Sequence, residues 1–188
     1  MTVKYDYLKK YIPGGPNVNK TRFWPLLPDE IEQGEEKMQR KFPPQLKEFY
    51  QEIGSGYLKS PYNAPEDYET YDRNEILSPV VAAHFYNLVI EHHKKPEDER
   101  TSLEVLLDLD RFYITYEDSS ITVEVLDVME PGDLPFFEIG ESCLFMVMKL
   151  NSDNPNAVWS DTGNKIEDSL ERFIWRLYYE DPSYHYIK

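Results

Sequence analysis

The sequence predicts an α+β domain, because helical and strand patterns occupy separate parts of the chain instead of alternating. Amphipathic helical periodicity dominates residues 29–93, and runs typical of strands follow between residues 103 and 160. A last amphipathic segment, residues 169–177, then predicts a final helix. The length of 188 residues suits one domain. Folding at this length buries about 70% of the unfolded surface, so neither disulfides nor a structural metal are needed.

The chain is both acidic and rich in aromatic residues. It contains 35 Asp and Glu against 20 Lys and Arg, a net charge of −15, and its 15 Tyr, 9 Phe and 3 Trp exclude an acidic disordered segment. Residues 1–28 carry five bases and one acid, a net +4, which leaves −19 on residues 29–188. Such a body repels phosphate backbones, which excludes direct binding of nucleic acid, and is complementary to a basic protein. The alternative is that the charge only maintains solubility.

Cysteine content and hydropathy indicate the cellular compartment in which we expect the protein. The single cysteine, Cys143, excludes an internal disulfide and any zinc site built from several cysteines. Neither a signal peptide nor a membrane span is apparent, so we expect a cytoplasmic protein that does not bind membranes.

Residues 1–28 are predicted to be an extended basic arm ahead of a single domain at residues 29–188. Prolines at positions 13, 16, 25 and 28 punctuate the arm. Its aromatic side chains indicate that parts of it pack on the domain; these are Tyr5, Tyr7, Tyr11, Phe23 and Trp24.

Three helices are expected in the first half of the domain. One begins near Pro28, and a second opens at Pro43-Pro44, since proline is tolerated in a first helical turn. The second helix ends at Gly54-Ser55-Gly56, and residues 57–73 are expected to form a loop. A third, residues 79–93, ends in His92 and His93, whose positive charge would complement the helix dipole.

The second half favours strands. Apolar residues alternate with other residues over residues 103–109, which favours a strand, although a short helix is an alternative there. Residues 112–116 and 121–125 also alternate, and together they predict a hairpin. Residues 143–150 are almost continuously apolar, as in a strand buried on both faces, and residues 157–160 should return beside them. The final helix has an inner face formed by Leu170, Phe173, Ile174 and Leu177.

Several of these segments together resemble the SUKH superfamily. Ile31, Glu35 and Met38 precede Phe42-Pro43, an aromatic helix and Gly54-Ser55-Gly56, which resembles the opening of that family. Residues 74–77 resemble its next short strand, residues 134–140 the entry to its central strand, and residues 166–177 its closing helix.

The resemblance implies an antiparallel sheet flanked by N-terminal and C-terminal helices, with an insertion at about residues 80–131. It also implies a role. Many bacterial members of the family are immunity proteins that bind the toxic domain of a polymorphic toxin, often a nuclease, and fungal relatives are scaffolds and regulators of cell-wall synthesis. Neither role requires catalysis.

No pattern in the sequence supports an enzyme, a metal site or a cofactor. Cys143 with His84 could form a nucleophile and base, but Cys143 begins an apolar strand, where an inert buried thiol is the better interpretation. His92 and His93 are adjacent on a helix and point in different directions, which does not suit a metal. Carboxylate pairs are inevitable among 35 acids, and no phosphate-binding loop is present.

Two segments are candidates for partner binding. The first contains five acids, which we expect along one sheet edge or in the adjoining loop, and two aromatic residues that we expect to be exposed. It contains no Lys or Arg, and its residues are Asp127, Glu130, Asp133, Phe136, Phe137, Glu138 and Glu141. The second mixes tyrosines, which anchor interfaces, with acids, which steer encounter; its residues are Tyr62, Tyr68, Tyr71 and Asp72. The alternatives are a solvated acidic loop and an ordinary mobile loop.

The sequence thus favours an immunity protein that neutralises a basic toxin, most simply a nuclease domain, through an acidic surface. We expect it to act as a monomer or weak homodimer. The alternative is a non-catalytic regulatory or scaffold domain that binds endogenous proteins.

Overall fold

A computed structural model of the protein describes residues 4–13, 21–58, 74–96, 123–139 and 144–180. Within them, one antiparallel sheet of seven strands follows the order of the chain from β1 to β7, so each strand pairs with its neighbours in sequence. The strands are β1 (Arg22–Trp24), β2 (Ser55–Leu58), β3 (Asn74–Ile76), β4 (Asp133–Ile139), β5 (Leu144–Lys149), β6 (Val158–Ser160) and β7 (Lys165–Glu167).

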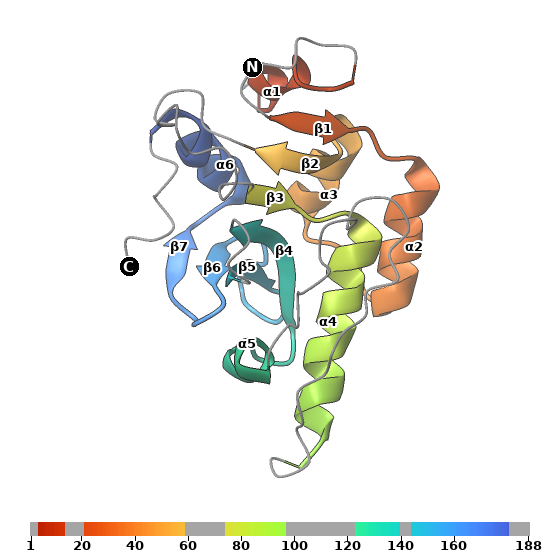
Figure 1. Ribbon diagram of the computed structural model, residues 1–188, viewed down its shortest axis with the longest axis vertical. Helices are drawn as coiled ribbons and strands as arrows, with labels where there is room; N and C mark the ends of the chain where they lie inside the picture. The colour runs from red at the N-terminus through yellow and green to blue at the C-terminus, as the bar shows by residue number, and fades with distance from the viewer. Residues whose placement is uncertain (1–3, 14–20, 59–73, 97–122, 140–143, 181–188) are drawn as a thin grey trace.

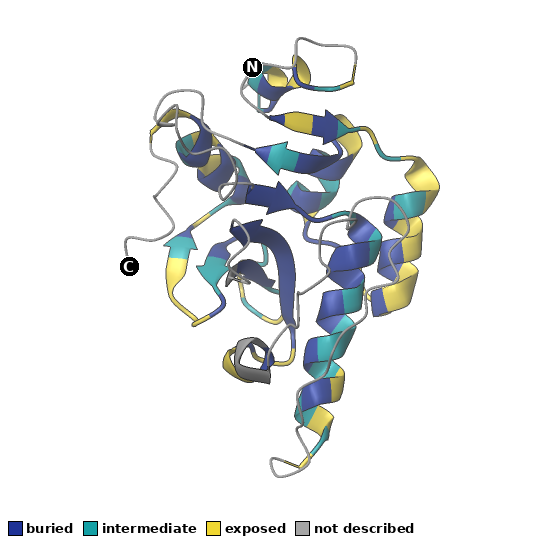
Figure 2. Cartoon of the chain, in the orientation of Figure 1, coloured by how far each residue is buried: buried dark blue, intermediate teal, exposed yellow. Residues whose placement is uncertain are grey.

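Helices from both ends of the chain flank this sheet, which confirms the predicted α+β class. They are α1 (Asp6–Lys9), α2 (Pro28–Met38), α3 (Pro44–Glu52), α4 (Pro79–Lys94), α5 (Val123–Val128) and α6 (Leu170–Tyr179). Figure 1 shows α2 and α4 side by side, with α6 beside β7 in another part of the molecule. Buried side chains of sheet and helices form one apolar core, and the outer sides of α2 and α6 stay exposed (Figure 2). No helix in the described ranges has the length and hydropathy of a membrane span.

The predicted helices at residues 28–38, 44–52, 79–94 and 170–179 are confirmed. Three of them begin with proline in the first turn, which is compatible with the missing amide hydrogen. Gly34 lies where α2 approaches α4 most closely, and a Cβ atom there would lie only 2.7 Å from the carbonyl oxygen of Pro79. The glycine therefore weakens the isolated helix but permits the packing of the two helices.

The N-terminal segment is more structured than an extended arm. Residues 6–9 form α1, and residues 22–24 form β1, which adds to the sheet beside β2. Tyr5, Leu8 and Phe23 are fully buried, as expected for aromatic packing on the domain. Lys4 Nζ lies 2.8 Å from Glu48 Oε2 on α3. Burial of these apolar side chains is the physical reason that the segment folds back instead of staying extended.

The strand predictions had mixed outcomes. Strands β5 and β6 confirm the prediction for residues 143–150 and 157–160, and Val147 pairs with Trp159 between them. The predicted hairpin is wrong in its described part, because residues 123–125 belong to helix α5. Residues 103–109 and 112–116 lie outside the described ranges. The predicted loop at residues 57–73 begins later than expected, since residues 57 and 58 belong to β2 and residues 59–73 are not described.

Candidate functional site

The two phenylalanines expected at the surface are fully buried. Phe136 and Phe137 are both 0% exposed in β4, which lies between β3 and β5. Both rings contact Phe173 of α6, with ring centroids 6.2 and 5.2 Å from it. The expectation of exposure is therefore wrong: these residues belong to the core that joins the sheet to α6.

Two of the acids expected at the surface are also buried. Asp133 and Glu138 are 3% exposed, and Asp133 Oδ2 accepts a hydrogen bond of 3.0 Å from the amide of Glu130. Burial raises the pKa of the Asp133 carboxyl above its usual value, although this amide and Lys149 act in the opposite direction. Neither carboxylate lies on an open sheet edge, so the physical reason for the correction is the central position of β4.

Asp127 and Glu130 are the two predicted binding residues that the structure exposes. They lie in and just after α5. Asp127 Oδ1 is 2.7 Å from His92 Nε2, and Glu130 Oε2 is 3.2 Å from Lys149 Nζ. They therefore form a small acidic end surface whose charge is partly balanced by Lys149.

His92 and His93, in the last turn of α4, contact α5 and hold it against the end of α4. His92 is fully buried against Asp127, and His93 Nε2 donates to the carbonyl oxygens of Leu126 and Met129 at 3.2 and 2.7 Å. These contacts give both histidines a structural partner on α5 in addition to their position in the last turn of α4. No cluster of three or more metal-ligating side chains occurs among the residues that the structure describes.

The remaining predicted residues lie outside the described ranges. They are Glu141, Tyr62, Tyr68, Tyr71 and Asp72, together with Cys143. His84, its suggested partner, is half-buried on α4, and burial lowers the pKa of its imidazole.

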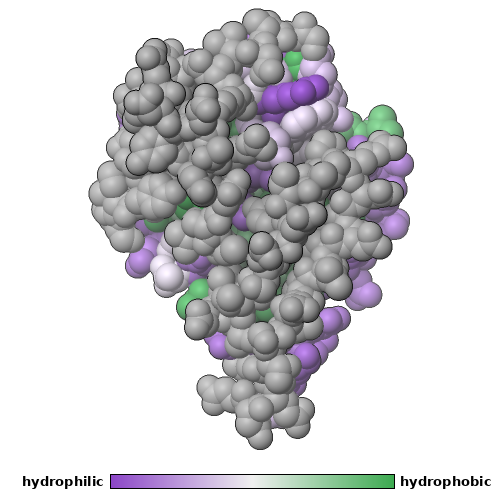
Figure 3. Space-filling model, in the orientation of Figure 1, coloured by the Kyte–Doolittle hydropathy of each residue, from purple (hydrophilic) through white to green (hydrophobic). Residues whose placement is uncertain are grey.

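The outer side of α2 carries an acidic stripe that the sequence analysis did not single out. Asp29, Glu32 and Glu36 are spaced by three and four residues, so they share one face of the helix, and all three are exposed. Leu27, just before the helix, is 64% exposed and is the most exposed large apolar side chain in the described ranges. Figure 3 shows this hydrophilic surface over α2 with a small hydrophobic group at its upper end.

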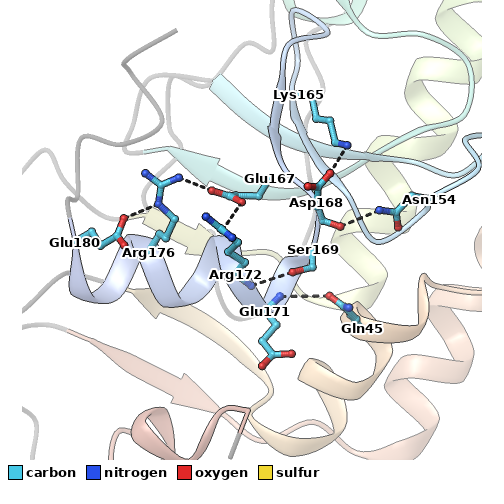
Figure 4. Close-up of polar contacts among 10 residues, drawn as sticks. All are labelled: Gln45, Asn154, Lys165, Glu167, Asp168, Ser169, Glu171, Arg172, Arg176 and Glu180. Atoms are coloured by element: carbon cyan, nitrogen blue, oxygen red, sulfur yellow. Dashed lines mark hydrogen bonds and ion pairs between the residues drawn. The ribbon is translucent and has the colours of Figure 1, made fainter. Parts of the chain in front are cut away.

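Helix α6 is fixed at its N-terminus by polar contacts that reach other elements (Figure 4). Ser169 Oγ accepts from the amide of Arg172 at 3.2 Å, as an N-cap does. The Glu171 amide donates to Gln45 Oε1 at 3.3 Å, and Asn154 Nδ2 donates to the carbonyl of Asp168 at 2.9 Å. These contacts connect the start of α6 to α3 and to the turn between β5 and β6.

A buried carboxylate orients the basic side of α6. Glu167 Oε2 lies 3.0 Å from Arg172 Nε, and Glu167 Oε1 lies 2.5 Å from Arg176 Nη1, as Figure 4 shows. Arg176 Nε also contacts Glu180 Oε2 at 2.5 Å. Arg172 remains 67% exposed, so its guanidinium is anchored at one nitrogen while most of it faces solvent.

Two large aromatic side chains lie exposed on α6. Trp175 is 44% exposed and Tyr179 is 37% exposed, and their rings contact each other at a tilt of 38° with centroids 5.2 Å apart. Tyr7, which follows the first residue of α1, lies 5.2 Å from the Tyr179 ring. With Lys4, Ser169, Glu171 and Arg172, these three aromatic residues line a groove of about 630 Å³, which we call the α1–α6 groove.

Sequence reasoning missed this groove although a signal was present. The inner face of the final helix was predicted from Phe173, Ile174 and Leu177, and those residues are buried. Trp175 and Tyr179 are four residues apart and fall outside that face, so their exposure follows from the same periodicity. Tyr7 and Lys4 could not be added from sequence, because their approach to α6 depends on the folding back of the N-terminal segment.

Comparison with known proteins agrees with this fold. The family model for the SMI1/KNR4 family (SUKH-1) matches residues 25–176. The chain belongs to the SUKH-1 family. Immunity protein YxxD of Bacillus subtilis (strain 168) is 26% identical to this SUKH-1 chain over 162 residues, which cover 86% of each protein. No solved structure matches the chain.

The motif at the start of this SUKH-1 domain has a structural explanation. Glu35 is buried at the end of α2, where its carboxylate contacts Lys41 Nζ at 2.7 Å and Lys47 Nζ at 2.9 Å. Burial raises the pKa of this carboxyl, but the hydrogen bonds from both lysines and from the Phe42 amide outweigh burial and hold the pKa below its usual value. Glu35 therefore joins α2 to α3, and the motif serves the fold.

Proposed function

We propose that this chain is an immunity protein, which binds a cognate toxin and blocks it without catalysing a reaction. The observation that carries the proposal is the match to immunity protein YxxD, which extends over 86% of both proteins. Membership of the SUKH-1 family supports the same role. The protein would act in the cytoplasm, where it meets its toxin.

The proposed partner is a basic protein, and a nuclease domain is the class that fits best. The net charge of −15 favours a partner of opposite sign. A nuclease binds phosphate backbones through basic side chains, and carboxylates placed in the same surface would imitate that charge. Inhibition would then follow from occupation of the active or substrate-binding surface of the toxin.

Two described surfaces are suited to this electrostatic contact. The acidic stripe of α2 combines Asp29, Glu32 and Glu36 with the exposed side chain of Leu27. The acidic end surface, Asp127 and Glu130, is smaller, and its charge is partly balanced by Lys149. We assign the first contact with the toxin to the stripe, because it joins several unburied acids to an apolar anchor.

The immunity role is tested by producing the chain together with the toxin domain encoded beside its gene. Cells that make both proteins should grow, cells that make the toxin alone should die, and the two purified proteins should form a complex. A complex with endogenous proteins instead, and no protection from the toxin, would contradict immunity and favour a regulatory or scaffold role.

The electrostatic part has its own test. Glu32→Lys with Glu36→Lys should slow association with the toxin by about tenfold at low salt, because charge on such a surface acts mainly on the association rate. Lys94→Glu, an exposed charge change of opposite sign on α4, should not slow it. Association that does not respond to salt or to these substitutions would overturn the acidic contact while leaving the immunity role intact.

A further inference from the structure

We propose that the α1–α6 groove is a second docking site, which takes a short segment of the toxin containing an aromatic side chain and a carboxylate. The inference rests on the proposed immunity role, because it names part of the partner. The groove differs from the acidic stripe in its location on the molecule and in the sign of its exposed charge. The groove lies at α6, and its most exposed charged side chain is the cation of Arg172.

The aromatic part of the groove has the composition of a protein-binding hot spot. Trp175 and Tyr179 contact each other and Tyr7 extends the surface, whereas the core-facing side of α6 is already filled by other residues. Tryptophan, tyrosine and arginine are the residues most enriched where truncation costs the most binding energy. Isolated exposed apolar residues are ordinary, but an aromatic pair in contact beside an arginine in a groove is a specific arrangement.

Charge complementarity identifies the partner segment as acidic. Arg172 is held at Nε by Glu167 and is 67% exposed, so the guanidinium is oriented before any partner arrives. A planar, fixed guanidinium matches a carboxylate with two parallel hydrogen bonds. Lys4 adds a second cation to the lining, although Glu48 contacts it, and Glu171 is the acid of the groove.

A groove that presents a cation has a role in a protein whose net charge is negative. Opposite charges at two separate surfaces allow only one orientation of a partner that presents a basic patch and an acidic segment at the matching distance. The acidic stripe would steer the basic toxin, and the groove would hold its acidic segment after contact. Loss of the groove should therefore raise the dissociation rate more than it lowers the association rate.

The test uses the full chain and the toxin domain with which it protects cells. Trp175→Ala and Arg172→Glu should each weaken binding by at least tenfold, a change that corresponds to about 1.4 kcal/mol. The matched control is Lys94→Glu, which makes the same change of charge as Arg172→Glu at an exposed cation of α4 and should leave the dissociation rate unchanged.

Overlapping short peptides that cover the toxin sequence then identify the segment. The unsubstituted chain should bind a peptide that contains Asp or Glu beside an aromatic residue, and Arg172→Glu should abolish this binding. Trp175→Phe keeps an aromatic ring at this position, so it tests the indole even if truncation to alanine perturbs folding. A few-fold loss of peptide affinity is expected for it.

The outcomes separate the two proposals. If the chain protects cells and binds the toxin but the groove variants bind unchanged, the groove inference is overturned and the immunity role stands. Capture of only basic peptides, or self-association through the groove, would also overturn it. If the unsubstituted chain neither binds nor protects, the immunity role fails first.

Discussion

Strand β4 and helix α6 each carry a pair of large aromatic residues, and the two pairs have opposite environments. Phe136 and Phe137 of β4 are 0% exposed, whereas Trp175 and Tyr179 of α6 are 44% and 37% exposed. Both segments combine aromatic with charged residues, although the charges of β4 are acids alone and α6 carries two arginines and one acid. The difference shows that exposure depends on the position of the element within the layers and on which face of it the residue occupies.

An irregularity in β4 explains why both phenylalanines are buried against the same ring. Successive side chains of a regular strand point to opposite faces. Between Pro135 and Phe137 the register with β5 shifts, so that Phe136 is an additional residue whose carbonyl accepts from the amide of Leu77. Both rings can therefore lie near Phe173 of α6. The α6 helix is regular, and its two exposed residues follow its period.

The largest effect is expected from truncation of the buried pair. Phe137→Ala removes a fully buried ring that contacts Phe173, so it should lower the free energy of unfolding by about 3–5 kcal/mol. Urea denaturation followed by circular dichroism measures the change. A loss below about 1 kcal/mol would show that β4 is not part of a packed core and would remove the contrast between the two pairs.

The contrast also shows what the sequence can and cannot predict. Helix starts at Pro28, Pro44 and Pro79 follow from local chemistry, and so does the buried face of α6. The hairpin prediction failed because α5 is held by His93, which donates to main-chain carbonyls far away in sequence. Long-range contacts of this kind, and β-bulges, override the alternation of apolar and polar residues, and they leave no periodic pattern in the sequence.

The residues of the candidate site divide in the same way, into those that local sequence predicts and those that depend on the fold. Exposure of Asp127 and Glu130 was predicted, and exposure of Trp175 could have been, because each depends on local pattern. Burial of Asp133 and Glu138 depends on β4 lying in the middle of the sheet. The groove also requires the N-terminal segment to fold back onto α6, which a spacing rule cannot express.

A smaller effect is expected where α6 joins the sheet. Glu167→Gln removes the charge that attracts Arg172 and Arg176, so it should lower the free energy of unfolding by about 1–3 kcal/mol and loosen the helix that carries the exposed pair. Asp168→Asn is the control, since this neighbouring acid is exposed and its carboxylate forms an ion pair with Lys165. It should cost less than about 0.5 kcal/mol. Equal effects of the two substitutions would mean that Glu167 does not anchor α6.

The buried acid of β4 predicts a pH dependence of definite sign. The folded pKa of Asp133 is raised by burial above its ordinary value of 3.8, so its contribution to stability is complete below that pH and is lost as pH rises through the folded pKa. Asp133→Asn lacks this loss and should be more stable than the unsubstituted chain at neutral pH, by less than about 1 kcal/mol, but not at pH 3.

Chemical denaturation of both proteins across this range measures the crossover. Asp168→Asn, at an exposed acid whose carboxyl pKa is lowered by the hydrogen bond from Lys165, should instead change stability with pH in the opposite direction. If Asp133→Asn were instead less stable at neutral pH than at low pH, relative to the unsubstituted chain, the pKa of Asp133 would be lowered and Lys149 would outweigh burial.

The smallest effect on stability is expected at the exposed pair itself. Trp175→Phe should change the free energy of unfolding by less than about 0.5 kcal/mol, because the indole packs on one side only. It should nevertheless remove most of the tryptophan emission that acrylamide quenches, since Trp24 and Trp159 are partly buried. If Trp24→Phe removed more of the quenchable emission, Trp175 would be covered in solution and the two aromatic pairs would not differ in exposure. Addition of the toxin should then protect Trp175 from acrylamide in the unsubstituted chain, which separates a groove that is merely open from one that receives a partner.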